Sequence, residues 1–340
     1  MALPNSGPLS MNAINVELGR SGTTPNTLLA GGSTPTAGSL FGLANSTINK
    51  VAPHSISEFY GYSNTPLLLD TYPLVGAAYS IRKLRSAYAG FCLRVKRSND
   101  NATLDVGFTN ANIVDTSAIT TFVGANTGTV VIWYDQSGNG YNATEWTGFV
   151  SPPIIVNAGT LQTLNTKVAI SFATRGLLGN SGVAMPNMIT TAGLFSAFGV
   201  GSANDTSTRL MMQIGGGANH AQAIRRNGSV LESIAFNTSN TAFTDAGSVN
   251  VGNTQFIACA ERRSTSIEIF TNAASNGATA TSGTARYTNP VMLLGLYTNS
   301  TSFAWNGLIQ ELITFAINPA VETTYRSGVT TNLNTFYGTY

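Results

Sequence analysis

Short apolar runs, separated by clusters of Gly, Asn, Ser and Thr, recur through the chain from about residue 150 onward. Each run has the length of a strand rather than a helix and contains many β-branched and aromatic residues. Regularly spaced runs of this kind are typical of an all-β sandwich, and Asn227-Gly228 adds a hairpin turn between two of them. We predict strands over 154–156, 168–172, 194–200, 210–214, 230–235, 256–261, 266–270, 291–296 and 308–315.

The stretch 129–142 joins a strand to a tight turn. Its first half alternates between two faces, as a buried strand does. In its second half Asp135 and Asn139 can hydrogen-bond their own backbone, and the glycines at 138 and 140 can take positive φ. The sequence therefore predicts a buried strand that ends in a polar loop. The expected faces are Val130, Ile132 and Tyr134 on one side and Val131 and Trp133 on the other.

Three helices are expected around the strands. The first begins at about Pro73 and ends before Gly90, with an apolar stripe on one side, and a strand over 91–95 follows it. The second begins at Asp115 or Thr116 and ends at Gly124. The third begins at Asn318-Pro319, which is a typical N-cap followed by proline at the first helical position. Its apolar stripe is Val321, Tyr325, Val329, Leu333 and Phe336.

Residues 1–65 differ from the rest of the chain. Prolines punctuate a Gly-, Ser-, Thr- and Asn-rich sequence with a few short apolar patches, which is too little to form a core of its own. Ser55 and Glu58 have capping-box spacing, so one helical turn closed by Gly61 is expected. We therefore predict an extended, irregular N-terminal arm over 1–65, followed by one sandwich domain over 66–340.

Composition excludes several classes of function. Only 9% of the 340 residues are charged and the net charge is +2, so no field that would gather nucleic acid is expected. The N-terminus lacks the features of a signal peptide, and no apolar run is long enough to span a bilayer. The protein is expected to be soluble and made in a cytosol. Cys92 and Cys259 are expected as buried free thiols, with a disulfide as the alternative.

Three blocks in order, 79–88, 94–103 and 134–140, resemble the opening segment of the fungal α-L-arabinofuranosidase B catalytic domain. The same blocks are similar to laminin-G/concanavalin-type domains of tailed-phage virion proteins. The resemblance covers roughly 70–150, and the last strand and closing helix resemble the end of the same kind of sandwich. It implies a mainly β fold, a concanavalin-like (laminin G-type) jelly-roll sandwich with a few short helices, and implies a fold more than a function.

The N-terminal segment resembles those of tailed-phage structural proteins. This implies a bacteriophage virion structural protein of the tail, fibre or capsid surface, displayed on the particle exterior after assembly in the host cytoplasm. Its expected partners are other virion proteins, further copies of itself and host-surface polysaccharide. The residues expected to attach it are Leu9, Met11, Ile14, Val16, Leu18, Ile56, Phe59 and Tyr60. A purely architectural capsid or tail decoration protein is one alternative.

An arabinofuranosidase-like glycoside hydrolase is the second alternative. A retaining hydrolase needs two carboxyl groups about 5–5.5 Å apart. Asp135 lies in the matching loop, but turn bonding explains it more simply. We therefore expect no catalytic residue and no enzyme. The downstream carboxylates, which do not match the motifs of that family, are Asp205, Glu232, Asp245, Glu261 and Glu268.

Glycan binding is expected at the sandwich rim. Tyr141 and Trp146 follow the turn and offer flat faces for sugar rings, with Asp135 and Asn139 beside them, whereas Trp133 and Trp305 are expected in the core. His54 and His220 are the only histidines, and neither has metal-ligand spacing around it. No cofactor or metal is expected, except that calcium could sit among the loop oxygens of Asp135, Asn139 or Asp205.

Overall fold

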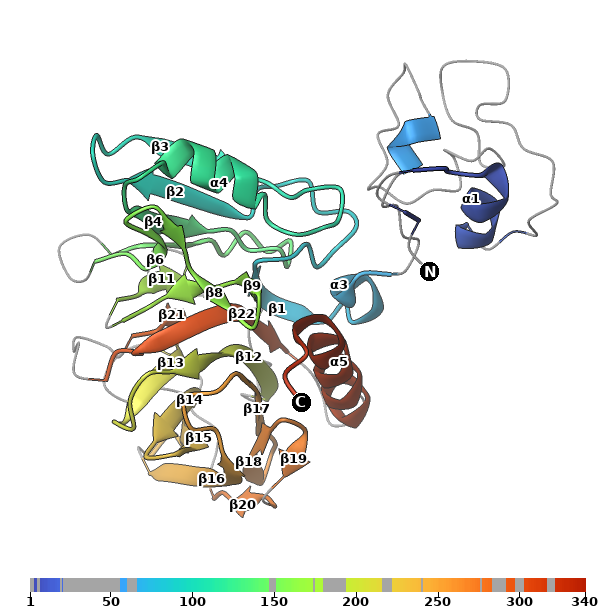
Figure 1. Ribbon diagram of the computed structural model, residues 1–340. Helices are drawn as coiled ribbons and strands as arrows, with labels where there is room; N and C mark the ends of the chain where they lie inside the picture. The colour runs from blue at the N-terminus through green and yellow to red at the C-terminus, as the bar shows by residue number, and fades with distance from the viewer. Residues whose placement is uncertain are drawn as a thin grey trace.

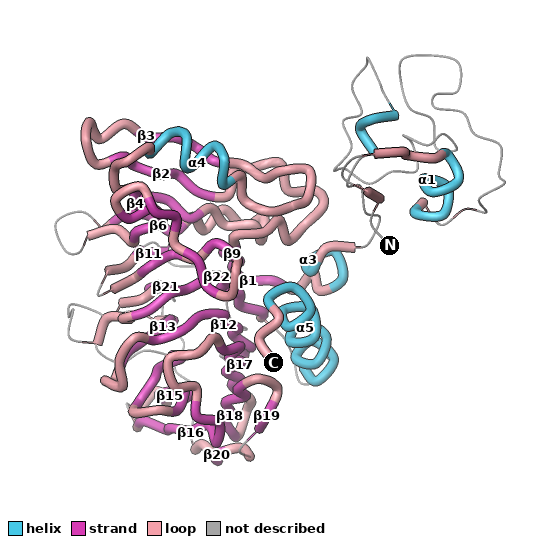
Figure 2. The backbone as a smooth tube through the Cα atoms, viewed as in Figure 1, coloured by secondary structure: helices cyan, strands magenta, loops and turns pink. Residues whose placement is uncertain are grey.

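The computed structural model describes most of the chain after residue 66 and a few segments before it. The described residues are 3–4, 7–18, 20, 56–59, 66–146, 151–173, 175–179, 194–215, 222–239, 241–275, 277–282, 292–296, 303–316 and 322–340. The fold is mainly β, with antiparallel strands and a few helices (Figures 1 and 2).

The strands pair in two runs that share β4 (Gly128–Trp133). One end of β4 pairs with β6 and the other end with β5, so the sheet divides into the two layers of a sandwich. The first layer runs through β3 (Thr103–Val106), β2 (Leu93–Arg97), β4, β6 (Ile154–Asn157), β10 (Ile170–Ser171), β22 (Gly307–Phe315), β12 (Phe195–Ala203), β17 (Phe256–Arg262) and β18 (Ser266–Thr271).

The second layer leaves β4 on its other side. It runs through β5 (Ala143–Glu145), β11 (Leu177–Gly179), β21 (Met292–Leu294), β13 (Arg209–Ile214), β14 (Gln222–Asn227), β15 (Val230–Phe236) and β16 (Ala242–Asn250). Three short strands extend the first layer, namely β7 (Thr160–Leu161) beside β6, and β19 (Ala274–Ser275) and β20 (Thr279–Ala280) beside β18. β8 (Thr163–Leu164) and β9 (Lys167–Val168) pair with each other in a separate two-stranded sheet. The mainly β sandwich expected from the sequence is confirmed.

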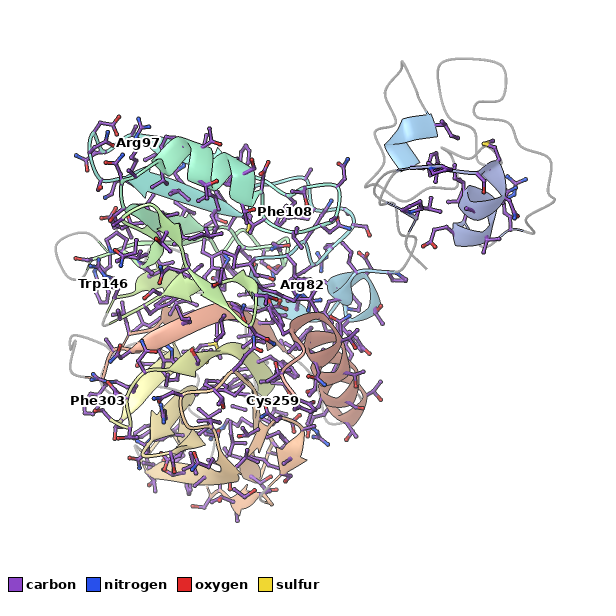
Figure 3. The ribbon with its side chains drawn as sticks, viewed as in Figure 1. Arg82, Arg97, Phe108, Trp146, Cys259 and Phe303 are labelled. Atoms are coloured by element: carbon purple, nitrogen blue, oxygen red, sulfur yellow. The ribbon has the colours of Figure 1, made fainter. Side chains whose placement is uncertain are left out.

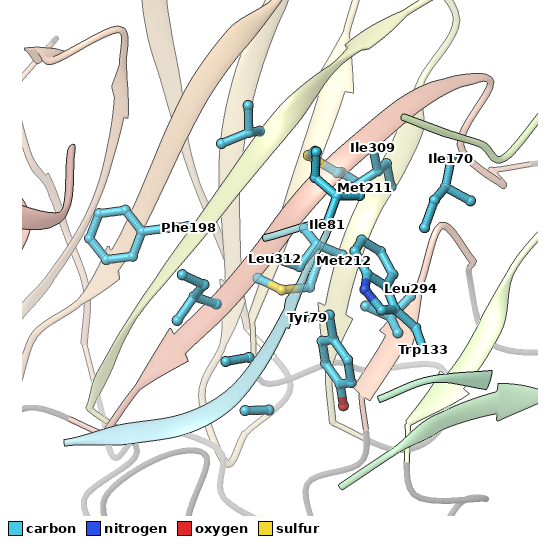
Figure 4. Packing of buried hydrophobic residues seen from close by; sticks show 14 of the residues in the cluster. Tyr79, Ile81, Trp133, Ile170, Phe198, Met211, Met212, Leu294, Ile309 and Leu312 are labelled. Carbon is cyan, nitrogen blue, oxygen red and sulfur yellow. The ribbon is translucent and has the colours of Figure 1, made fainter. Parts of the chain in front are cut away.

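Large apolar side chains fill the space between the layers. Trp133 and Trp305 are both fully buried, as expected, and Phe198 and Met211 pack in the same cluster. Figure 4 shows Trp133 beside Tyr79 and Leu294, at the place where three strands from distant parts of the sequence meet. Burial of this apolar surface stabilises the fold.

The prediction of a helix between Pro73 and Gly90 is wrong. Residues Val75–Ser80 form strand β1, which pairs antiparallel with the C-terminal half of β22 and is buried throughout. A buried strand is apolar on both faces, so it shows no period-2 alternation and its apolar residues also match a helical stripe. Only one turn of helix, α3 (Leu68–Thr71), precedes it.

A β-bulge changes the expected faces of β4. Arg94 of β2 pairs with Ile132, but the next residue, Val95, pairs with Val130, so one residue of β4 is left over between them. Val130 and Trp133 therefore both enter the main core, while Ile132 is half-buried. The alternation of 130–134 could not show this, because a bulge inserts one residue and shifts the period.

Two helices lie where the sequence places them. Helix α4 (Thr116–Val123) begins after Asp115, whose side chain accepts from the Ala118 amide, and ends at Gly124 with positive φ. Helix α5 (Glu322–Tyr337) buries Tyr325, Val329 and Leu333, while the expected N-cap at 318–319 lies outside the described residues. The predicted strands after residue 150 are also found, within a few residues at their ends.

The N-terminal segment contains a small apolar cluster, so the expectation that it forms no core of its own is wrong for the described residues. Ile14 and Leu18 of α1 (Met11–Glu17) are buried with Leu3 and with Phe59 of the short helix η1 (Ile56–Phe59). The helical turn expected near Glu58 is thus confirmed. Of the other residues named above, Met11 and Val16 are exposed, Leu9 and Ile56 pack on the cluster, and Tyr60 lies outside the described residues.

Cys92 and Cys259 are both buried free thiols, as expected, and burial raises the pKa of each well above its ordinary value. Across the described residues, we find no helix that combines the length and the apolar character needed to cross a membrane.

Candidate functional site

The loop after β4 is held together by Asp135. Its carboxylate accepts the backbone N–H groups of Ala78, Ser137 and Tyr141, each at 2.9 Å, and the Ser137 hydroxyl at 2.6 Å. Asn139 donates to the Gly76 carbonyl at 2.8 Å. The loop is therefore fastened to β1, and its polar side chains are used for structure.

The two aromatic residues expected at the rim lie deeper than the sequence suggests. Tyr141 is only 8% exposed and belongs to the main core. Trp146 is half-buried and packs against Leu293, Leu296 and Ala304. Tyr141 therefore presents little of its ring to a ligand, and glycan binding at this loop stays a prediction.

Every Asp and Glu after residue 66 lies in the described ranges, so all carboxylates of the sandwich can be compared. Six of these thirteen carboxylates each form an ion pair with one base that they do not share, such as Asp105 with Arg94 at 2.6 Å and Glu145 with Lys96 at 3.1 Å. The hydrogen bond from Arg94 lowers the pKa of Asp105. Asp105 is therefore ionised at neutral pH and has no proton to donate.

Three carboxylates meet around one guanidinium, and we call Glu261, Glu268, Glu322 and the arginines 263 and 326 the Arg263 cluster. Arg263 contacts all three carboxylates, each at 2.5 Å. Arg326 adds a contact to Glu261 at 2.8 Å. Glu261 and Glu268 are directly opposite in the pairing of β17 with β18, and Glu322 is the first residue of α5. Like charges directly opposite on a sheet repel, so the arginines are needed to hold them together.

The carboxylates of the Arg263 cluster differ in proton affinity. Burial, together with a hydrogen bond to Glu322, raises the pKa of Glu261 to about 8. Burial alone would also raise the pKa of Glu322, but the hydrogen bond from Glu261 and the arginine charges outweigh it and lower that pKa. A protonated carboxyl beside an ionised one is the combination that glycosidases use as acid and nucleophile.

Access to the Arg263 cluster runs through its arginines. The Glu261 side chain is 1% exposed, whereas Arg263 and Arg326 are 24% and 21% exposed. Arg326 also lines a cavity of about 180 Å³ with Phe270, Thr330 and Tyr340. This cavity is smaller than most ligand pockets, so it holds at most a single sugar unit, and a substrate reaches Glu261 only if an arginine moves.

Two terminal nitrogens of Arg263 hold one carboxylate each. Nη1 donates to Glu268 and Nη2 donates to Glu261, each at 2.5 Å, so both carboxylates lie on the same guanidinium. Glu261 is also hydrogen-bonded to Glu322. Among the described residues, no group of three or more His, Cys, Asp and Glu side chains could hold a metal ion.

Sequence reasoning named Glu261 and Glu268 but missed Glu322 and both arginines. Glu322 is about 60 residues from Glu261 in the sequence, and only the packing of α5 against β17 brings the two together. One signal was available, because two glutamates on strands joined by a short turn fall opposite each other in a hairpin and require a cation between them.

Comparison with protein families gives one match within the chain. Residues 68–171 match the family model described as "Alpha-L-arabinofuranosidase B, catalytic". Comparison with curated protein sequences gives no match. The matched segment contains β1–β10 and the loop held by Asp135, whereas the Arg263 cluster lies after it.

Solved structures of arabinofuranosidases have the same fold. An arabinofuranosidase complexed with arabinofuranosyl-α-1,2-xylobiose superposes with a TM-score of 0.58 at 18% sequence identity, over 76% of this chain and 62% of that one. A GH54 α-L-arabinofuranosidase soaked with a cyclic sulfate inhibitor gives a TM-score of 0.57 at 19% identity, over 76% and 63%. The chain thus spans less than two thirds of the length of either structure.

These comparisons correct the expected function. The expectations of a phage virion protein, with its tail, capsid-decoration and host-attachment roles, and of a chain that is not an enzyme are both wrong. The family match is to a catalytic domain, and the similar structures described above are glycoside hydrolases rather than virion proteins. The findings favour the hydrolase alternative instead.

Proposed function

We propose that this protein is an arabinofuranosidase-like glycoside hydrolase. The observation that carries the proposal is the match of residues 68–171 to the catalytic domain of α-L-arabinofuranosidase B. The shared sandwich fold supports it, although the fold alone hosts many functions. The raised pKa of Glu261 gives the site a carboxyl group that can donate a proton, with other carboxylates beside it.

In this proposal Glu261 is the general acid and Glu268 is the nucleophile. Protonated Glu261 donates its proton to the leaving glycosidic oxygen while a Glu268 oxygen attacks the anomeric carbon, which forms a glycosyl-enzyme ester and breaks the glycosidic bond. Ionised Glu261 then takes a proton from water, whose oxygen attacks the same carbon and releases Glu268.

Arg263 has to leave its position for this reaction to occur. Its guanidinium lies between the two carboxylates and neutralises the nucleophile, so a sugar can enter only when the side chain turns toward solvent. Its partial exposure allows this movement. Arg263 is therefore a positioning residue that opens or closes the Arg263 cluster.

Turnover of 4-nitrophenyl α-L-arabinofuranoside tests the proposal, because a similar structure was soaked with this compound. We expect the full chain to release 4-nitrophenol. Glu261→Gln and Glu268→Gln should each reduce kcat roughly 100- to 10,000-fold. Glu145→Gln is the matched control, since this carboxylate pairs only with Lys96 on a half-buried sheet face and its loss should leave turnover close to normal.

The outcomes separate the function from the site. Absence of turnover by the folded chain on arabinofuranosides contradicts the proposed function. Turnover that survives both glutamine substitutions keeps the function and excludes the Arg263 cluster as its site. Thermal melting of each variant shows whether a loss of activity is merely a loss of fold.

A further inference from the structure

A second pocket lies between the segment 88–91, which precedes β2, and the segment 107–112, away from the Arg263 cluster. Its volume is about 310 Å³, within the range of ligand sites. In Figure 3, Phe108, which lines this pocket, lies in the upper part of the sandwich, whereas Cys259, two residues before Glu261, lies in the lower part. A ligand in this pocket therefore does not contact the proposed catalytic carboxylates.

Aromatic rings form the apolar part of this pocket. Phe91 is 47% exposed and leans on Tyr134, with 6.1 Å between ring centroids. Tyr88 packs edge-on against Phe108 at 6.3 Å, and its hydroxyl donates to the Phe91 carbonyl at 2.8 Å. The rings are held by one another and by the backbone, so their faces are prepared before a ligand arrives.

Gly90 makes this arrangement of rings possible. A Cβ at this position would lie 2.5 Å from the Tyr88 hydroxyl and 2.7 Å from Cζ of the same ring. Any larger residue would therefore push the Tyr88 ring out of its place. The close contact between the Tyr88 ring and the backbone therefore requires glycine at position 90.

Polar groups surround the rings. Asn110 and Asn112 line the pocket, and their side-chain amides make no hydrogen bond within the described part of the chain. The Lys83 ammonium likewise has no ion pair or hydrogen bond there, and Asp70 acts on it only at longer range. In a protein whose other described bases are mostly paired, a lysine left without a partner beside aromatic rings points to an anionic ligand.

We infer that this pocket binds an acidic sugar of the uronic acid class, as a carbohydrate-binding site separate from catalysis. The faces of Phe91 and Tyr88 stack on the apolar face of the pyranose ring, the two asparagine amides bond its hydroxyl groups, and Lys83 pairs with its carboxylate. The site recognises a class of polysaccharide that carries carboxylates and does not depend on whether the Arg263 cluster hydrolyses arabinofuranosides.

Calorimetric titration of the full chain with trigalacturonate, and with its neutral counterpart galactotriose, tests this inference. We expect trigalacturonate to bind, and galactotriose to bind roughly tenfold more weakly or not at all. Phe91→Ala should weaken binding about tenfold or more, by analogy with base–aromatic stacking. Lys83→Gln should remove the preference for the acidic sugar and its dependence on salt.

Phe303→Ala is the matched control, because Phe303 is 39% exposed and lies at the opposite edge of the sandwich from Phe108 (Figure 3). This variant should bind trigalacturonate normally. The inference is overturned if neither sugar binds, if both bind equally, or if Phe91→Ala and Lys83→Gln leave binding unchanged. Turnover of the arabinofuranoside, measured in the same variants, should stay normal, so this inference and the proposed function fail independently.

Discussion

The protonation of Glu261 makes the stability of this protein depend on pH. In the folded state burial raises the pKa of Glu261 to about 8, whereas in the unfolded chain it returns to its ordinary value of 4.5. Between these two values the folded protein binds one proton more than the unfolded chain. The free energy of unfolding therefore falls as pH rises from 4.5 to 8, and it levels off above that range.

The size of this effect follows from linkage. One proton is worth about 1.4 kcal/mol per pH unit, so the full range corresponds to at most about 5 kcal/mol. Glu322 shares this proton through its hydrogen bond with Glu261, which reduces the expected loss between pH 5 and pH 8 to about 2–4 kcal/mol. The lowered pKa of Glu322 acts below 4.5, outside this window, where stability is lost as pH falls.

Urea unfolding at pH 5, 6, 7 and 8 measures this loss directly. Glu261→Gln removes the titrating group but keeps the shape of the protonated acid, so its stability should change little over the same range. The difference between the two proteins cancels the contribution of the histidines. A slope in the wild type that is flat or rising, or one that the variant retains, refutes the assigned protonation of Glu261.

Three substitutions test the sandwich itself by the same urea assay. Trp133→Ala removes a fully buried indole between the layers and should cost about 3–5 kcal/mol, and a loss under about 1 kcal/mol would mean that the ring is not in the core. Asp135→Asn replaces one carboxylate oxygen by an NH₂ group, which cannot accept the backbone N–H groups of Ser137 and Tyr141, so it should cost roughly 2–4 kcal/mol. Equal stability of this variant would show that the loop does not rely on the charge. Gly307→Ala places a Cβ 2.0 Å from the Ser202 carbonyl and should cost about 1–3 kcal/mol, while Gly107→Ala, whose Cβ meets nothing within 4 Å, serves as its control.

Local patterns in the sequence were sufficient to predict the class of fold. The strand-length apolar runs, the N-cap at Asp115 and the hairpin at Asn227-Gly228 each depend on residues within a few positions of one another. Such features need no knowledge of distant contacts. The resemblance over 70–150 also agrees with the family match over 68–171.

The sequence led to the wrong function because the blocks that it shares with other proteins carry information about the fold. The resemblance to two groups of proteins rested on blocks that serve the fold, since Asp135 and Asn139 fasten their loop to β1. Blocks that serve the fold indicate the architecture and leave the activity open. The family match to a catalytic domain was needed to decide between a virion protein and a hydrolase.

What the sequence by itself determined was therefore the mainly β sandwich, most of its strands, two of its helices and its buried tryptophans. Only the tertiary structure decided that 75–80 is a strand, that β4 carries a bulge, and that Glu322 joins Glu261 and Glu268 around Arg263. The physical reason is that these features depend on partners far away in the chain. A strand buried on both faces lacks a periodic signal, and the pKa of a carboxyl is set by the charges and the burial that folding brings to it.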